Sequence, residues 1–139
     1  MTRYLLDTNI MDKRSLKNRC HPNVSRWFSS VDEQEIFLSV LVIGELRCGI
    51  ERIRRRDPDA AFYLETWLKQ VVSGYAHRIF PITQEIAETW GRMNVPNPIS
   101  TVDGLLAATA KVHDCTLVTR NTKDISQCDI LFYNPFLSS

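Results

Sequence analysis

Hydrophobic positions along the chain follow two alternating spacings, one typical of short buried strands and one typical of helices. Short apolar runs predict strands at residues 4–6, 35–40, 78–82, 116–119 and 130–133. Between these runs, hydrophobic residues recur at every third or fourth position, which predicts helices. Strands that alternate with helices favour parallel pairing, so the pattern predicts a three-layer α/β domain.

Helix-capping residues and prolines indicate where several helices begin and end. The predicted helices cover residues 22–31, 41–57, 58–74, 83–95 and 100–113. Asp57 followed by Pro58 has the pattern of an N-cap with proline in the first turn, and Thr83 is a second N-cap. Either Ser100 or Thr101 begins the last helix.

Composition fits one globular domain over residues 1–139. The chain has 44% hydrophobic and 24% charged residues, which is ordinary for a folded domain of this length. No apolar run approaches the ~20 residues of a membrane span, and the first residues lack the apolar segment of a signal peptide. The simplest interpretation is a cytoplasmic protein.

The cysteines and the net charge exclude few classes of function. The four cysteines form no CxxC pair and do not combine with the histidines in a zinc-binding spacing, so we expect small buried or half-buried thiols. The net charge is +1, with basic clusters at residues 13–19 and 47–56. These clusters fit phosphate contacts and solvated helix surfaces equally well.

Four carboxylates fall where a parallel α/β sheet binds its ligands, at the carboxyl ends of strands. Asp7 directly follows the first strand, and Asp124 lies just after the fourth. Glu45 and Asp103 lie in the first turns of helices that should begin near the same edge. Converging carboxylates repel one another unless a cation joins them, and Mg²⁺ or Mn²⁺ suits oxygen ligands. Such a site can hydrolyse phosphodiesters.

Each acid also has a structural interpretation. Asp103 follows Ser100 by three residues, which matches a capping box, and Asp7 could cap a turn. Asp124 could be a solvated loop acid. Glu45 could pair with Arg47 or Arg52 on its own helix, although its apolar neighbours would make a free charge there costly.

Four segments together resemble the PIN-domain family. They are residues 4–10 (YLLDTNI), Ser39 with residues 44–50 (GELRCGI), residues 102–110 (VDGLLAATA) and residues 117–124 (LVTRNTKD). They occur in the family's order and frame nearly the whole chain. They are most similar to the VapC and FitB-like toxins of bacterial toxin–antitoxin pairs.

The resemblance implies an endoribonuclease that depends on Mg²⁺ or Mn²⁺, with a four- or five-stranded parallel sheet. It implies that the catalytic and metal-binding acids are Asp7, Glu45, Asp103 and, on the last segment, Asp124. It implies supporting roles for Thr8, Asn9, Thr101 and Asn121. Candidate RNA-phosphate contacts are Lys13, Arg14, Arg47 and Arg120.

The resemblance also implies a homodimer and a small antitoxin that covers the active-site groove. The chain departs from the family pattern at Ile125, where an aromatic residue is usual, and in the short segment 93–99.

Two other functions are open to a chain with these acids. A phosphatase or receiver domain also places an aspartate at a strand end, but Asn9 stands where the phosphatase pattern needs a second aspartate. The other alternative is a PIN module that binds RNA or protein without cutting. A pure binder has no need of four mutually repelling acids, which favours the nuclease.

Overall fold

The computed structural model describes residues 2–15 and 21–137, without the side chains of residues 12–15. Its centre is one sheet of five strands in the order β3-β2-β1-β4-β5, and every neighbouring pair is parallel. The strands are β1 (Tyr4–Leu6), β2 (Ile36–Ser39), β3 (Ile79–Phe80), β4 (Thr116–Val118) and β5 (Phe132–Tyr133). The predicted parallel sheet is therefore confirmed; β1 has its predicted bounds, and the other four strands are shorter than the apolar runs suggested.

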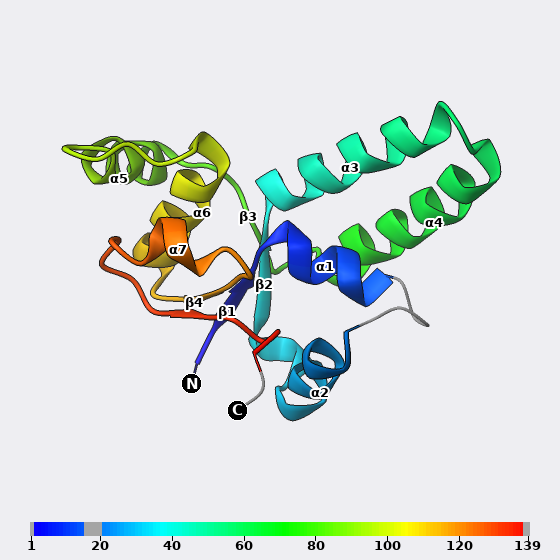
Figure 1. The fold of residues 1–139 in the computed structure, drawn as a ribbon, viewed down its shortest axis with the longest axis horizontal. Coiled ribbons are helices and arrows are strands. Elements are labelled where there is room, and N and C mark those ends of the chain that lie inside the picture. Colours follow the sequence, from blue (N-terminus) through cyan, green and yellow to red (C-terminus); the bar gives the residue numbers. More distant parts are fainter. Residues whose placement is uncertain (1, 16–20, 138–139) are drawn as a thin grey trace.

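Helices cover both sides of this sheet, with α6 on one side and α1 and α4 on the other (Figure 1). The helices are α1 (Thr8–Ser15), α2 (Pro22–Ser30), α3 (Val40–Arg54), α4 (Pro58–Gly74), α5 (Gln84–Met93), α6 (Thr101–His113) and α7 (Thr122–Ile125). A short 3-10 turn, η1 (Glu33–Glu35), precedes β2. In the described part of the chain, no helix is long and apolar enough to cross a membrane.

Two of the predicted caps form as expected. The Asp57 carboxylate accepts the backbone N–H of Ala60 at 3.1 Å, and the Thr83 hydroxyl accepts that of Ile86 at 3.2 Å. Each satisfies a backbone donor that the first turn of a helix would leave unpaired. Helices α1 and α7 were not predicted, because their first residues read as turn formers after a strand.

The core lies between the sheet and the helices on each side. Leu5, Leu6 and Leu38 of the sheet are fully buried, and removing such a side chain costs about 2–5 kcal/mol. On α6, Ala107 and Ala110 are also fully buried, so small side chains let this helix pack closely on the sheet. This packing fixes the end of β1, which Asp7 follows, relative to the first turn of α6, which contains Asp103.

The middle strand β1 extends into the site through its backbone. Beyond Leu6, the backbone N–H of Asp7 donates to the carbonyl of Val118 at 2.9 Å, which continues the pairing of β1 with β4. The first acidic residue therefore has a backbone position set by the sheet itself rather than by a free loop.

Candidate active site

Asp7 is a buried carboxylate at the carboxyl end of β1, with 7% of its surface exposed. The backbone N–H of Thr8 donates to its Oδ1 at 2.6 Å, and the Thr119 hydroxyl donates to its Oδ2 at 2.7 Å. The Asn9 side-chain amide lies 3.4 Å from the same Oδ2. Hydrogen bonds of this kind favour the ionised carboxylate and fix its orientation.

Burial nevertheless raises the pKa of Asp7, and it is the largest influence on this group. The hydrogen bonds from Thr119 and Thr8 lower the pKa, whereas the charges of Asp103 and Glu45 raise it further. Carboxylates from α3 and α6 therefore act on Asp7, which directly follows β1, at this edge of the sheet. Their mutual repulsion is the condition that a bound cation would relieve.

Asn121 connects two further acids. Its side-chain amide donates to Oδ2 of Asp103 at 3.1 Å and to Oδ2 of Asp124 at 3.0 Å. Asp103 lies in the first turn of α6 and Asp124 in the first turn of α7. One amide thus holds two carboxylates, from helices that the fold places next to each other.

The capping-box interpretation of Asp103 is wrong. The Ser100 side chain makes no cap hydrogen bond to the first turn of α6. Its hydroxyl instead donates to Oδ2 of Asp103 at 2.7 Å. Asp103 is therefore the acceptor of side-chain donors from Ser100 and Asn121. Its carboxylate lies at the acidic edge, by which we mean the edge of the sheet with Asp7, Glu45, Asp103 and Asp124.

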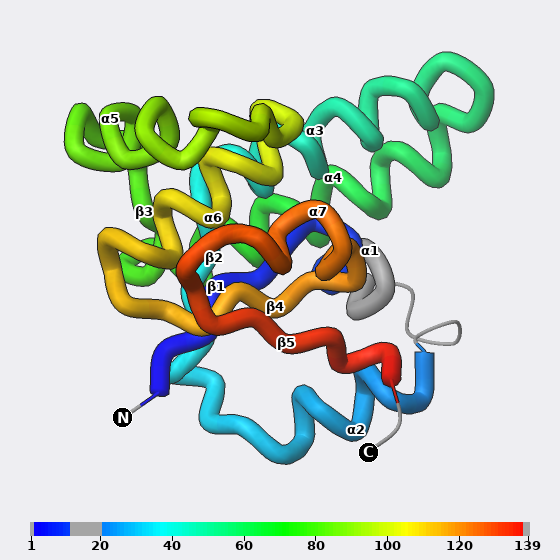
Figure 2. Tube along the Cα trace, turned by 60° about the vertical axis from the view of Figure 1, so that its left-hand side comes forward, coloured from blue at the N-terminus to red at the C-terminus, as the bar shows by residue number. Residues whose placement is uncertain are grey.

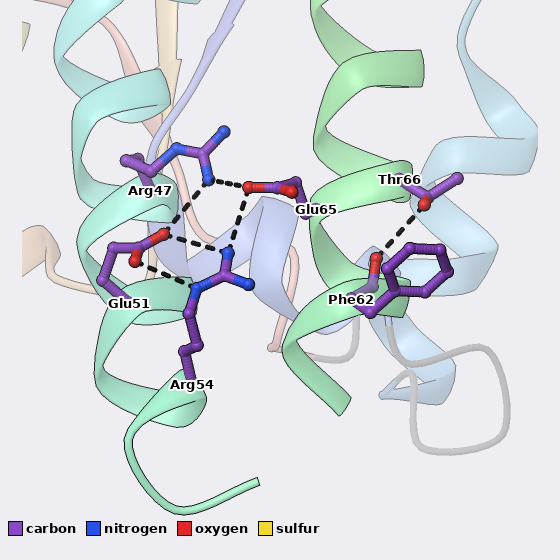
Figure 3. Close-up of polar contacts among 6 residues, drawn as sticks. All are labelled: Arg47, Glu51, Arg54, Phe62, Glu65 and Thr66. Carbon is purple, nitrogen blue, oxygen red and sulfur yellow. Dashed lines mark hydrogen bonds and ion pairs between the residues drawn. The ribbon is translucent and has the colours of Figure 1, made fainter. Parts of the chain in front are cut away.

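Glu45 is exposed on α3 and accepts a hydrogen bond from the Thr8 hydroxyl. The alternative in which Glu45 pairs with Arg47 is wrong. Arg47 instead contacts Glu65 of α4 at 2.6 Å and Glu51 at 3.2 Å (Figure 3).

The Arg47 ion pairs belong to a network that joins α3 to α4. Arg54 contacts the same two glutamates, each at 3.0 Å. These groups are partly exposed, so each pair contributes little stability on its own. The network gives Arg47 two carboxylate partners, and its contact with RNA phosphate stays a prediction.

Sequence reasoning missed two hydroxyls, those of Thr119 and Ser100. Thr119 directly follows β4, so its position at the carboxyl edge was the available signal. Of the predicted supporting residues, Thr8, Asn9 and Asn121 contact the acids, whereas the hydroxyl that reaches Asp103 is that of Ser100 and not of Thr101.

The structure describes the side chains of only some of the predicted phosphate contacts. The side chains of Lys13 and Arg14 lie outside the described part of the chain. Arg120 is exposed and directly follows Thr119, at the acidic edge.

The donor set has the chemistry that a hard divalent cation requires. The four acids and the Asn121 amide offer only oxygen ligands, as Mg²⁺ and Mn²⁺ prefer. Among the described side chains, those of residues 2–11 and 21–137, no group of three or more His, Cys, Asp or Glu is already arranged to hold a metal. Asn121 and Thr8 hold these carboxylates by donated hydrogen bonds, and a cation would take over those oxygens.

The sequence of this chain is similar to known proteins over most of its length. A family model described as the PIN domain matches residues 4–130. Toxin FitB of Neisseria gonorrhoeae is 27% identical over 137 residues, which cover 95% of this chain and 97% of that protein. Ribonuclease VapC14 of Mycobacterium tuberculosis is 32% identical over 69 residues, 50% of this chain and 66% of that protein.

A solved structure agrees over nearly the full fold. The crystal structure of FitAcB from Neisseria gonorrhoeae matches with a TM-score of 0.88 and 28% identity, over 96% of this chain and 98% of that one.

Proposed function

The chain belongs to the PIN domain family, and from this membership we propose that it is a metal-dependent endoribonuclease, the toxin of a type II toxin–antitoxin pair. The observation that carries the proposal is the buried Asp7 carboxylate, which faces the charges of Asp103 and Glu45. Similarity to proteins named Toxin FitB and Ribonuclease VapC14 supports the toxin role and the choice of RNA.

Mg²⁺ or Mn²⁺ is the cofactor in this proposal. Asp7, Glu45, Asp103 and Asp124 would hold the cation. Bound there, it would lower the pKa of a water and stabilise the charge on the leaving oxygen of a phosphodiester. Water would add to phosphorus in line, the bond to the 3′-oxygen would break, and that oxygen would leave with a proton.

The chain's own residues would supply preorganisation. Thr119 and the Thr8 backbone orient the two oxygens of Asp7. Asn121 sets the separation of Asp103 and Asp124. A site whose carboxylates are already oriented loses less free energy when it binds a charged substrate and a cation.

Cleavage of total cellular RNA by the purified chain tests the proposal. The assay contains Mg²⁺, Mn²⁺ or EDTA, and compares the chain with its D7N variant. A matched control is Asp129→Asn, since the Asp129 side chain is 99% exposed. We expect metal-dependent cutting by the chain and by D129N, and loss of cutting in D7N. Full activity of D7N would overturn the mechanism.

A PIN module that binds without cutting is the second candidate. It is favoured by the Asn121 side-chain amide, which already donates to both Asp103 and Asp124 where a cation would otherwise join them. A folded chain that binds single-stranded RNA but cuts no RNA with either metal would establish this alternative.

The remaining proposals concern partners and place of action. We propose a homodimer, a small antitoxin that covers the acidic edge, and action on RNA in the cytoplasm. The mass of the purified chain in solution tests the dimer. Inhibition of cleavage by a small protein that binds the purified chain tests the antitoxin.

A further inference from the structure

The C-terminal segment continues past the family match at residue 130 and runs along α2. Figure 2 shows this red segment between α2 and the turn that joins β4 to α7, and Figure 1 shows the same neighbourhood of α2 and the C-terminal end. The segment therefore extends the surface beside the acidic edge toward α2.

Arg120 connects the acidic edge to this segment. Its backbone N–H donates to Oδ1 of Asn9 at 3.3 Å, and Asn9 in turn contacts Asp7. Its guanidinium lies over the ring of Phe136, 4.8 Å from the ring centre. A guanidinium stacked on an aromatic ring keeps its N–H donors available at its edges.

Contacts continue from Phe136 to α2. The side-chain amide of Asn23 donates to the carbonyl of Phe136 at 2.7 Å, and the Arg26 guanidinium donates to Oδ1 of Asn23 at 3.2 Å. Arg26 is exposed, so a second cation lies on the same surface as Arg120.

A cavity of about 200 Å³ lies at this second cation. Arg26 and Asn23 line it together with Tyr133, the last residue of β5, whose side chain is 40% exposed. None of the described residues that line it is acidic. Neither Arg26 nor Arg120 forms an ion pair with a carboxylate in the described ranges.

We propose that Asn23, Arg26, Arg120, Tyr133 and Phe136 form a C-terminal track that binds single-stranded RNA beside the scissile phosphate. This inference rests on the proposed ribonuclease function. Arg120 binds the phosphate next to the acids, Arg26 binds a phosphate further along the strand, and a base stacks on Tyr133. Cations that track a backbone, combined with aromatic rings for bases, are how proteins bind single strands without a sequence preference.

The charge of the track favours nucleic acid over a protein partner. Both guanidiniums are exposed and without a carboxylate partner among the described residues, unlike Arg47 and Arg54, which glutamates neutralise. The acids of the site would repel RNA, so cations at its border are needed to hold phosphates there.

The test measures binding of a short, labelled, single-stranded RNA of mixed sequence to the D7N variant, which removes cleavage from the measurement. R26A and R120A are added separately to D7N. The matched control is Arg56→Ala, an exposed arginine after α3 with the same loss of charge; Figure 1 shows the α3–α4 end far from α2. Thermal unfolding of each variant checks that it is folded.

We expect R26A and R120A each to weaken binding about fivefold or more, and to reduce the slope of log Kd against log salt by about 0.7, the value for one lost phosphate contact on a single strand. R56A should change neither quantity. Phe136→Leu removes the ring beneath Arg120, so it should weaken binding. Because it keeps the charge of the track, it should not change the slope.

Binding and slope of R26A and R120A equal to those of R56A would overturn the track. If R26A and R120A leave RNA binding unchanged but, placed in the chain that keeps Asp7, abolish antitoxin inhibition of cleavage, the surface belongs to a protein partner, which also overturns the track. Because D7N binding needs no cleavage, a chain that cuts no RNA would refute the ribonuclease and still leave the track measurable.

Discussion

The hydroxyl of Thr119 donates a 2.7 Å hydrogen bond to Oδ2 of Asp7, across a separation of 112 residues. The same hydroxyl accepts the backbone N–H of Asn121 at 3.0 Å. One buried threonine therefore connects the acid that follows β1 to the backbone of Asn121, the residue whose side-chain amide holds Asp103 and Asp124. Thr119 therefore joins Asp7 to Asn121 by hydrogen bonds, although it is not itself an acid.

Replacing Thr119 by valine should reduce RNA cleavage about tenfold or more. Valine has nearly the same shape but cannot donate to Asp7, and a hydrogen bond to a charged group contributes about 1.5–3 kcal/mol. Mn²⁺ affinity, measured by calorimetry on the same variant, should fall as well. Thr119→Ser restores the donor, so it should recover most of the activity; an inactive serine variant would argue that the methyl group matters instead.

His113 should make the protein less stable in mild acid. Its ring stacks on Phe80 with centres 3.7 Å apart, and its Nε2 is buried without a hydrogen-bond partner among the described residues. Burial lowers the pKa of His113, and the charge of Arg3 lowers it further, against a smaller opposing effect of Glu85.

The direction of this pH effect follows from the difference between the pKa of His113 in the folded protein and its pKa in the unfolded protein. The unfolded histidine titrates near pH 6.5, about the ordinary value, and the folded one titrates lower. The stability contribution of neutral His113 is therefore present above about pH 6.5 and is lost as pH falls toward the folded pKa. Urea unfolding of the chain should show a larger loss from about pH 7.5 to about pH 5.5 than that of His113→Phe, which keeps the stacked ring and does not titrate. Equal losses in both proteins would contradict this account.

Gly104 should not tolerate alanine. A Cβ at this position of α6 would lie 2.8 Å from Cδ1 and 2.9 Å from Nε1 of Trp90 on α5. We expect G104A to lower the free energy of unfolding by about 1–3 kcal/mol, as overpacking does. The smaller ring of Trp90→Phe should lessen this cost in the double variant. Additive losses would show that Trp90 is not the obstacle.

Cys115 should react slowly with alkylating reagents. Burial raises the pKa of its thiol to about 11, and the thiolate is the reactive form. Cys48 is exposed and should react with iodoacetamide much faster in the folded protein. Mass spectrometry of the digested protein gives the two rates separately. Comparable rates under native conditions, with equal reactivity in denaturant as the reference, would contradict the buried thiol.

The elements that the sequence predicted are those that local patterns determine. Buried strands such as β1 and β4 follow from their apolar runs, and the caps Asp57 and Thr83 follow from residue type alone. Helix α1 was not predicted, because a helix that begins immediately after a strand shares its first residues with a turn pattern.

The positions of the acids and of three supporting donors were predicted, whereas the hydroxyls of Ser100 and Thr119 were not. Strand ends place Asp7 and Asp124 at one edge by topology alone. The direction of the Ser100 hydroxyl depends on where α6 packs, so its sequence spacing suggested a cap that does not form. In the same way, the partner of Arg47 lies on another helix, and only the packing of α3 on α4 brings Glu65 to it.

The position of β1 in the middle of the sheet has a consequence for synthesis. Strand β1 pairs with β2 on one side and with β4, more than a hundred positions later in the chain, on the other. A nascent chain therefore holds Asp7 without Thr119 or Asn121 until most of the protein has been made. Such distant pairings also form slowly. Incomplete products that end before β4 should consequently be inert, and the acidic edge should be assembled only after the residues that follow β4 have been made.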